Sequence, residues 1–174
     1  MTNGYLGIDE SNHGREPEIF VAVHSSHKLD IEFHHSLGKH RKHSRINSVI
    51  GGIDFRSIVV LSQYKRNFSD SDMKIIVFSE FIKSFGQLEK VVIDGEVDDE
   101  ILAGVEKAIY PIVVPQLISE PKADVSYPIV NIADQIANHL FRNYVKNRSV
   151  GKKFEKHMLL PRLNDYRFLT NRPS

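Results

Sequence analysis

Short apolar runs separated by polar turns fill the first third of the chain and predict strands. Residues 4–9 form the first run, and residues 19–23 form a second one after Pro17, close enough for an antiparallel hairpin. The alternating stretch 29–33 predicts an extension of this hairpin. A further apolar run at 56–64 predicts a third strand.

The later part of the chain alternates between helical and strand periodicity. The predicted elements are a helix at about 70–85, a strand at 90–94, a helix at 98–109, a strand at 112–118 and a helix at about 130–146. Pro115 favours an edge or bulge position for its strand. The order β-β-β-α-β-α-β-α predicts an α/β protein with a mixed five-stranded sheet and helices on both faces.

Composition narrows the class of protein. A length of 174 residues with 41% apolar and 26% charged residues is typical of one globular domain, which we place at 1–150, followed by a basic C-terminal tail at 151–174. The absence of cysteine excludes disulfides, thiolate zinc sites and thiol nucleophiles. The absence of cysteine favours a cytoplasmic protein. No apolar run approaches the roughly 20 residues of a membrane helix, so we expect no membrane partner.

Acids stand where predicted strands end. Asp9 and Glu10 close the first strand before a turn of small polar residues, Asp94 closes the fourth, and Asp134 lies near the start of the last helix. Buried acids are costly unless something positive meets them, and a divalent cation is the usual answer.

These motifs resemble the ribonuclease H-like superfamily, and type 2 ribonuclease H in particular. Those enzymes open on a Gly-Ile-Asp-Glu strand end, matched here at 7–10, and their fourth strand ends in Asp-Gly, matched at 94–95. The segment 131–137, Asn-Ile-Ala-Asp-Gln-Ile-Ala, is similar to their last helix. It is nearer still to uncharacterised ribonuclease H-like proteins that pair Asp-Glu-Ser with an Ala-Asp helix.

The resemblance implies a metal-dependent nuclease that uses two Mg²⁺ or Mn²⁺ ions. In that architecture the first and fourth strands are neighbours, so Asp9 and Asp94 meet, and Glu10 and Asp134 complete the acidic site. Asp9 would bridge both ions, with Asp94 and Glu10 on one and Asp134 on the other. A metal-activated water would attack the phosphodiester.

Each acid also has a simpler interpretation. An acid at a strand end is often a turn or helix cap, and an acid near a helix N-terminus is favoured by the macrodipole without any metal. Glu80 is a further candidate, because classical members of the superfamily carry an acid on the first helix.

Basic residues gather in the turn after the first strand and in residues 36–48. Sequence-independent contacts to nucleic-acid phosphates are expected of these side chains: His13, Arg15, Lys39, Arg41, Lys42 and Arg45. A solvated basic loop explains the second group equally well. A zinc site from the histidines at 34, 35, 40 and 43 is a weaker alternative, because their spacing matches no common ligand pattern.

Three functions therefore remain. The first is a metal-dependent nuclease acting on RNA, DNA or their hybrid. The second is a non-catalytic domain of the same fold that binds nucleic acid or serves as a scaffold, and the third is a metal-dependent hydrolase of a small phosphoester.

Overall fold

The computed structural model describes residues 4–11, 16–33 and 46–170. Its five strands are β1 (Gly4–Ser11), β2 (Glu18–Ser25), β3 (Phe55–Val60), β4 (Leu88–Asp94) and β5 (Gln116–Glu120). Its α-helices are α1 (Ile46–Val49), α2 (Asp70–Phe85), α3 (Asp99–Ile109), α4 (Pro128–Asn147) and α5 (Arg167–Thr170). Short 3-10 turns are found at Lys28–Ile31, Ile50–Gly52, Tyr64–Arg66, Ala123–Val125, Lys152–His157 and Leu163–Tyr166.

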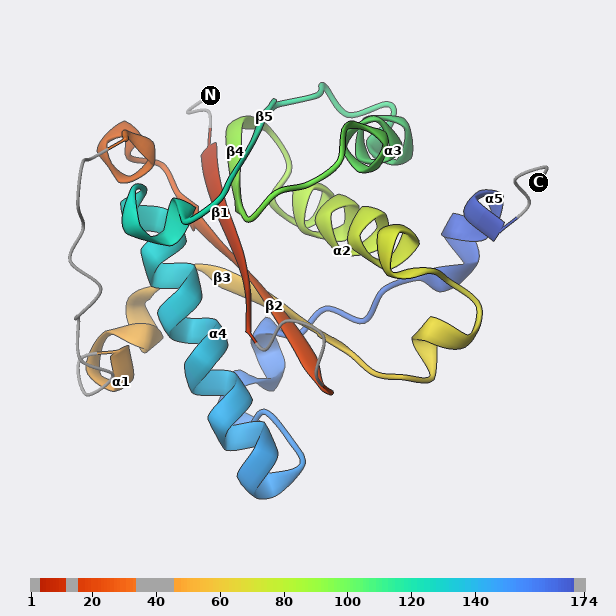
Figure 1. Ribbon diagram of the computed structural model, residues 1–174. Coiled ribbons are helices and arrows are strands. Elements are labelled where there is room, and N and C mark those ends of the chain that lie inside the picture. The colour runs from red at the N-terminus through yellow and green to blue at the C-terminus, as the bar shows by residue number, and fades with distance from the viewer. Residues whose placement is uncertain (1–3, 12–15, 34–45, 171–174) are drawn as a thin grey trace.

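The strands form one mixed sheet in the order β3-β2-β1-β4-β5. The hairpin partners β1, β2 and β3 are antiparallel, and β4 and β5 run parallel to β1. The sheet lies between α4 on one side and α2 with α3 on the other (Figure 1). The predicted fold class, with its strand count and helices on both faces, is confirmed.

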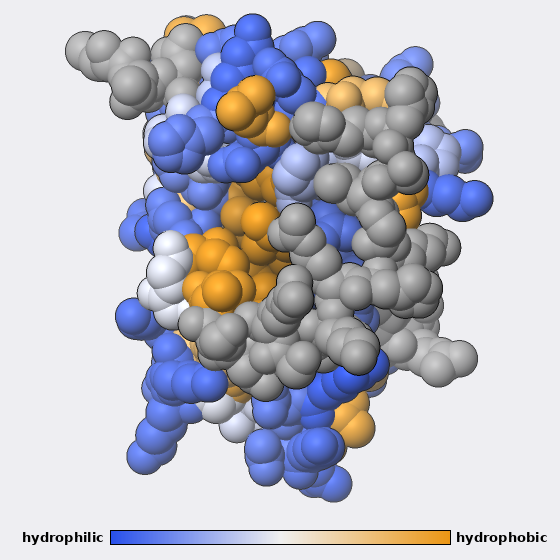
Figure 2. All heavy atoms as spheres, turned by 90° about the vertical axis from the view of Figure 1, so that its left-hand side faces the viewer, coloured by the Kyte–Doolittle hydropathy of each residue, from blue (hydrophilic) through white to orange (hydrophobic). Residues whose placement is uncertain are grey.

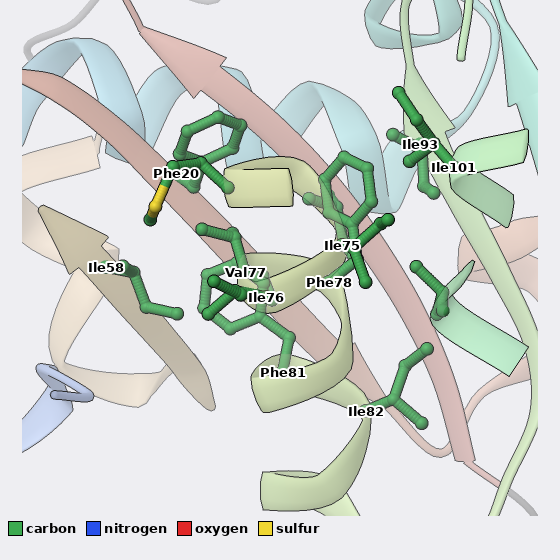
Figure 3. Packing of buried hydrophobic residues seen from close by; sticks show 14 of the residues in the cluster. Phe20, Ile58, Ile75, Ile76, Val77, Phe78, Phe81, Ile82, Ile93 and Ile101 are labelled. Atoms are coloured by element: carbon green, nitrogen blue, oxygen red, sulfur yellow. The ribbon is translucent and has the colours of Figure 1, made fainter. Parts of the chain in front are cut away.

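Each face of the sheet buries its own apolar cluster. Leu6 and Ile8 of β1 point towards α2, where they join a cluster that Figure 3 shows around Ile75 and Phe78. Tyr5 points to the opposite face and packs among residues of α4. The alternation along β1 follows from the pleat of a strand, in which neighbouring side chains leave on opposite faces.

Three local predictions are wrong. The third strand ends at Val60 rather than at residue 64, and Tyr64–Arg66 forms a 3-10 turn. Residues 29–33 do not extend the hairpin: Lys28–Ile31 forms a 3-10 turn, of which only Ile31 is buried. The last strand begins at Gln116 rather than at residue 112, and its first pairing partner is Lys90. Pro115 offers no amide hydrogen for a ladder, so pairing starts after it, and β5 is an edge strand as its proline indicates.

Gly7 lets α4 lie against the middle of β1. A Cβ placed there would come within 2.8 Å of the Ile129 carbonyl carbon and 2.9 Å of the Val130 nitrogen. Only a residue without a side chain allows that approach, so Gly7 sets how closely the first turn of α4 meets the strand that carries Asp9.

The segment after α4 packs against the rest of the chain. Met158 bridges to Ser57 of β3, and Tyr166 is fully buried against α2. The Tyr166 hydroxyl donates to Glu80 over 2.6 Å and accepts from Lys83 over 3.1 Å. The last described residues therefore cover α2 on the side where Glu80 lies.

The α4 side carries a mixed surface. Figure 2 faces this side and shows apolar side chains gathered in its middle, between hydrophilic ones. Leu29 and Val49 are among the exposed apolar residues of the chain, and Phe33 stacks edge-on with Tyr127. In the described part of the chain, every helix is too short or too polar to cross a membrane.

Candidate active site

Asp9 is the most buried acid of the described residues, with 5% of its surface exposed. It follows Ile8, which pairs with Ile93 of the neighbouring parallel strand, so Asp9 and Asp94 stand side by side where β1 and β4 approach their ends. The side chains of the two strands alternate between the faces of the sheet in the same register, with Ile8 and Ile93 both on the α2 side. Asp9 and Asp94 therefore share the α4 face of the sheet.

The charges of three other acids act on Asp9. Burial, together with the charges of Asp94, Asp134 and, more weakly, Asp124, raises the pKa of Asp9 to about 9, although the hydrogen bond from the Glu10 amide lowers it. The amide donates to Asp9 Oδ1 over 2.6 Å. We call Asp9, Asp94, Asp124 and Asp134 the acidic cluster.

The direction of this shift has a simple physical meaning. A carboxylate that is taken out of water and set beside other carboxylates gives up its charge unless a cation compensates it. No cation is among the causes that set the pKa of Asp9. Among the described side chains, no cation therefore offsets the charge that an ionised Asp9 would carry.

Asp134 enters the cluster from α4, and its position corrects one expectation. The helix begins at Pro128, so Asp134 lies in the second turn and not near the start. The macrodipole acts mainly on the first turn and does not account for an acid there. Asn138, one turn later, donates to Asp134 Oδ1 over 2.6 Å and holds this carboxylate from within the helix.

Asp124 was not predicted from the sequence. It lies in the 3-10 turn between β5 and α4, and its amide donates to Asp94 Oδ1 over 3.2 Å. A signal for it was present: Pro128 is favoured in the first turn of a helix, so the acid just before it falls in a short connection at the same sheet end as Asp94. The pairing of Asp94 with Glu120 of β5 fixes that end.

Buried amides of α4 support this connection. Asn131 donates to the Asp124 carbonyl over 2.9 Å, and Gln135 donates to Asn131 Oδ1 over 2.7 Å. Asn131 and Gln135 are 9% and 8% exposed. A line of hydrogen bonds thus runs from the helix through Asp124 to Asp94.

Glu10 lies on the other face. It lines a cavity of about 160 Å³ on the α2 side of the strand ends, together with Lys74 of α2. Asp9 and Asp94 border the same cavity from the sheet edge. Glu10 is therefore adjacent to the acidic cluster, but its side chain leaves β1 in the opposite direction.

One other predicted acid lies away from the acidic cluster. Glu80 lies on α2, where it accepts a hydrogen bond from the Tyr166 hydroxyl. His13, Arg15, Lys39, Arg41, Lys42 and Arg45 lie outside the described residues, as do the histidines at 34, 35, 40 and 43.

The donors suit a hard divalent cation, because all of them are carboxylate oxygens. Within residues 4–11, 16–33 and 46–170, however, no three His, Asp or Glu side chains are arranged as a ready metal cage. The charges of the other acids act on Asp9, but the described carboxylates do not surround one common position as the ligands of a bound ion would.

Comparisons with known proteins agree with this fold. Neither a protein-family model nor a curated protein matches the sequence. Among solved structures, ribonuclease H2 from Pyrococcus horikoshii OT3 is similar with a TM-score of 0.57 and 20% identity, over 88% of this chain and 76% of that one.

Two further structures are similar. Ribonuclease HII from Archaeoglobus fulgidus, solved in complex with PCNA, gives a TM-score of 0.57 and 17% identity over 85% of this chain and 78% of that one. Bst-RNase HIII in complex with Mn²⁺ gives a TM-score of 0.56 and 12% identity over 90% of this chain and 60% of that one. The chain has a ribonuclease H-like fold.

Proposed function

We propose that the protein is a divalent-metal-dependent nuclease that hydrolyses nucleic-acid phosphodiesters. Its functional acids are Asp9, Glu10, Asp94 and Asp134, to which we add Asp124. Similar solved structures include ribonucleases H, and one of these was determined with Mn²⁺. A fold hosts more than one activity, so the residues of the site decide which activity this chain has.

The observation that carries the proposal is the state of Asp9. Its buried carboxyl has a pKa raised to about 9 by burial and by the neighbouring acids. Holding several acids at such a position costs stability, and functional sites are where proteins accept that cost. A structural role as a turn cap does not account for it, because within the described part of the chain only the Glu10 amide donates to the Asp9 carboxyl.

Mg²⁺ or Mn²⁺ matches an all-oxygen donor set. Two such ions would supply a nucleophilic water and charge stabilisation for the leaving oxygen. In this proposal Asp9 and Asp94 hold the metal from the sheet, Asp134 and Asp124 approach from the α4 side, and Glu10 from the α2 side. Nucleic acid would be the partner, with His13, Arg15, Lys39, Arg41, Lys42 and Arg45 along its phosphates.

The test is a cleavage screen in Mg²⁺ and in Mn²⁺ against labelled nucleic acids of different types. The panel holds an RNA–DNA hybrid, duplex DNA with one ribonucleotide, a branched DNA junction and single strands. We expect the wild-type chain to cleave at least one of them and Asp94→Asn to be inactive with an unchanged unfolding curve. The matched control is Asp98→Asn, the same substitution at an exposed position at the start of α3.

Titration with Mn²⁺ gives an independent measure. Saturable binding to the wild type that Asp94→Asn loses and Asp98→Asn keeps would support a metal site at the acidic cluster. Full cleavage by Asp94→Asn would remove this residue from the mechanism.

A non-catalytic nucleic-acid-binding or scaffold domain is the second candidate. It is favoured by the missing ready-made cage among the described acids. This function predicts binding to the same panel without turnover in either metal, and it predicts that Asp94→Asn binds as the wild type does.

A further inference from the structure

The cavity on the α2 side of the acidic cluster has an unusual lining. Its floor is apolar, formed by buried residues that include Phe20 and Phe78, and its rim carries the carboxylates of Glu10 and Glu96. Lys74, on the second turn of α2, is the one cation among the described residues that line it.

Lys74 has no ion-pair partner within the described part of the chain. Lys65, by contrast, forms two ion pairs: its Nζ lies 2.8 Å from Glu18 Oε1 and 3.0 Å from Asp70 Oδ1. Lys74 is half-buried, so holding its long side chain beside the cavity has a cost in solvation and entropy. Its charge is also absent from the influences on the pKa of Asp9, so it does not serve as the counter-ion of that carboxyl.

We propose that Lys74 binds a backbone phosphate of the nucleic acid, in the cavity between α2 and the ends of β1 and β4. The proposal rests on the proposed nuclease function and adds a named contact to it. The ligand class is a phosphodiester anion, which meets an ammonium group as a point charge.

The placement gives the contact its role. Asp9 and Asp94 border the cavity from the sheet edge, and Lys74 borders it from α2, so a strand held at the acids passes Lys74. The acids alone would repel a phosphate backbone. A cation on the opposite wall of the same cavity offsets this repulsion and fixes the side on which the strand lies.

The experiment measures binding and not turnover. A short fluorescent RNA–DNA hybrid is titrated with wild type, Lys74→Met and Lys74→Arg in Ca²⁺ at several salt concentrations. We expect Lys74→Met to bind about tenfold more weakly, as for the loss of one charge-assisted hydrogen bond. Its salt dependence should fall by about one phosphate contact, a change in slope of roughly 0.9. Lys74→Arg keeps the charge and should bind close to the wild type.

Lys107→Met is the matched control, because it removes one lysine from α3 at an exposed position outside the cavity. It should leave both affinity and salt slope unchanged. Equal values for wild type and Lys74→Met, including no binding by either, overturn the proposal. So does tighter Mn²⁺ binding by Lys74→Met without loss of nucleic-acid affinity, which would make Lys74 a counter-ion of the acids.

The two proposals fail separately. Loss of binding in Lys74→Met together with no cleavage by the wild type would remove the nuclease and leave the phosphate contact in place. Cleavage by the wild type with unaltered binding by Lys74→Met would support the nuclease and remove the phosphate contact at Lys74.

Discussion

The amide of Asp124 donates a hydrogen bond to Oδ1 of Asp94 over 3.2 Å, and this contact ties the loop before α4 to the end of β4. The same loop is held from the helix side, where Asn131 donates to the Asp124 carbonyl. Asp94 is therefore oriented by α4 through one intervening residue. A displacement of α4 relative to the sheet should therefore change the positions of both Asp134 and Asp94.

The first prediction concerns Asn131→Leu. The substitution removes the donor to Asp124 and the acceptor of Gln135, so a buried amide of Gln135 loses its partner. We expect the free energy of unfolding to fall by about 1–3 kcal/mol. We also expect Mn²⁺ affinity to fall by roughly 10–100-fold, as for other groups that orient metal ligands. Urea unfolding and calorimetric titration measure the two effects.

Asn143→Leu is the control for that variant. Asn143 also lies on α4 and donates to the His139 carbonyl over 2.9 Å, but it lies three turns further along the helix than Asn131. It should lose stability and keep its Mn²⁺ affinity. Unchanged Mn²⁺ binding in folded Asn131→Leu would mean that Asp124 does not depend on this anchor.

The second prediction concerns Asp9 and pH. The ordinary pKa of an aspartate is 3.8, and burial with the nearby carboxylates raises that of Asp9 to about 9. Between these values the folded chain holds a proton that the unfolded chain has lost, so the free energy of unfolding falls as pH rises. Asp9→Asn has no such charge. We expect it to be more stable than the wild type by roughly 1–2 kcal/mol at about pH 8, and equal to it near pH 4.

Thermal unfolding without added metal, measured across this pH range, tests the second prediction. Asp98→Asn, at an exposed position, should show no such gain. Added Mn²⁺ should raise the melting temperature of the wild type but not of Asp9→Asn, because a bound cation takes the place of the proton. A wild type whose stability rises from pH 5 to pH 9 relative to Asp9→Asn contradicts the expected direction.

The third prediction separates Glu80 from the site. The Tyr166 hydroxyl donates to Glu80, and burial followed by this hydrogen bond raises the pKa of Tyr166 well above its usual range. Tyr166→Phe should lose about 1 kcal/mol of stability. Glu80→Gln should cleave any substrate at the wild-type rate. A large loss of cleavage in Glu80→Gln, without loss of stability, would return Glu80 to the list of functional acids.

The order of elements was predictable because the strands are short, apolar and separated by clear turns. The prediction failed where a segment had too few residues to define a period. Residues 29–33 alternate as a strand does, yet five residues with one buried side chain, Ile31, fit a single 3-10 turn equally well. At β5 the run of apolar residues begins before Pro115. Hydrogen bonding to β4 begins only after it, because proline has no amide hydrogen to donate.

The site was predictable only where strands carry it. Asp9 and Asp94 follow from the parallel pairing of β1 with β4, which the order of elements already implies. The opposite direction of Glu10 follows from the pleat and was within reach of the sequence. Asp124 lies in a short connection that Pro128 indicated, but no periodicity singles it out there, and its contact with Asp94 is visible only in the structure.

The last prediction concerns the distance between α4 and the sheet. A methyl group at Gly7 would meet the backbone of Ile129 and Val130, which cannot rotate away as a side chain can. Gly7→Ala should therefore displace α4 and lower the free energy of unfolding by about 1–3 kcal/mol. Because α4 carries Asp134 and anchors Asp124, the variant should also bind Mn²⁺ more weakly than its loss of stability explains. Gly51→Ala is the control, since a Cβ there meets nothing within 4 Å. Wild-type Mn²⁺ affinity in folded Gly7→Ala would show that the metal site does not need α4 at its present distance from β1.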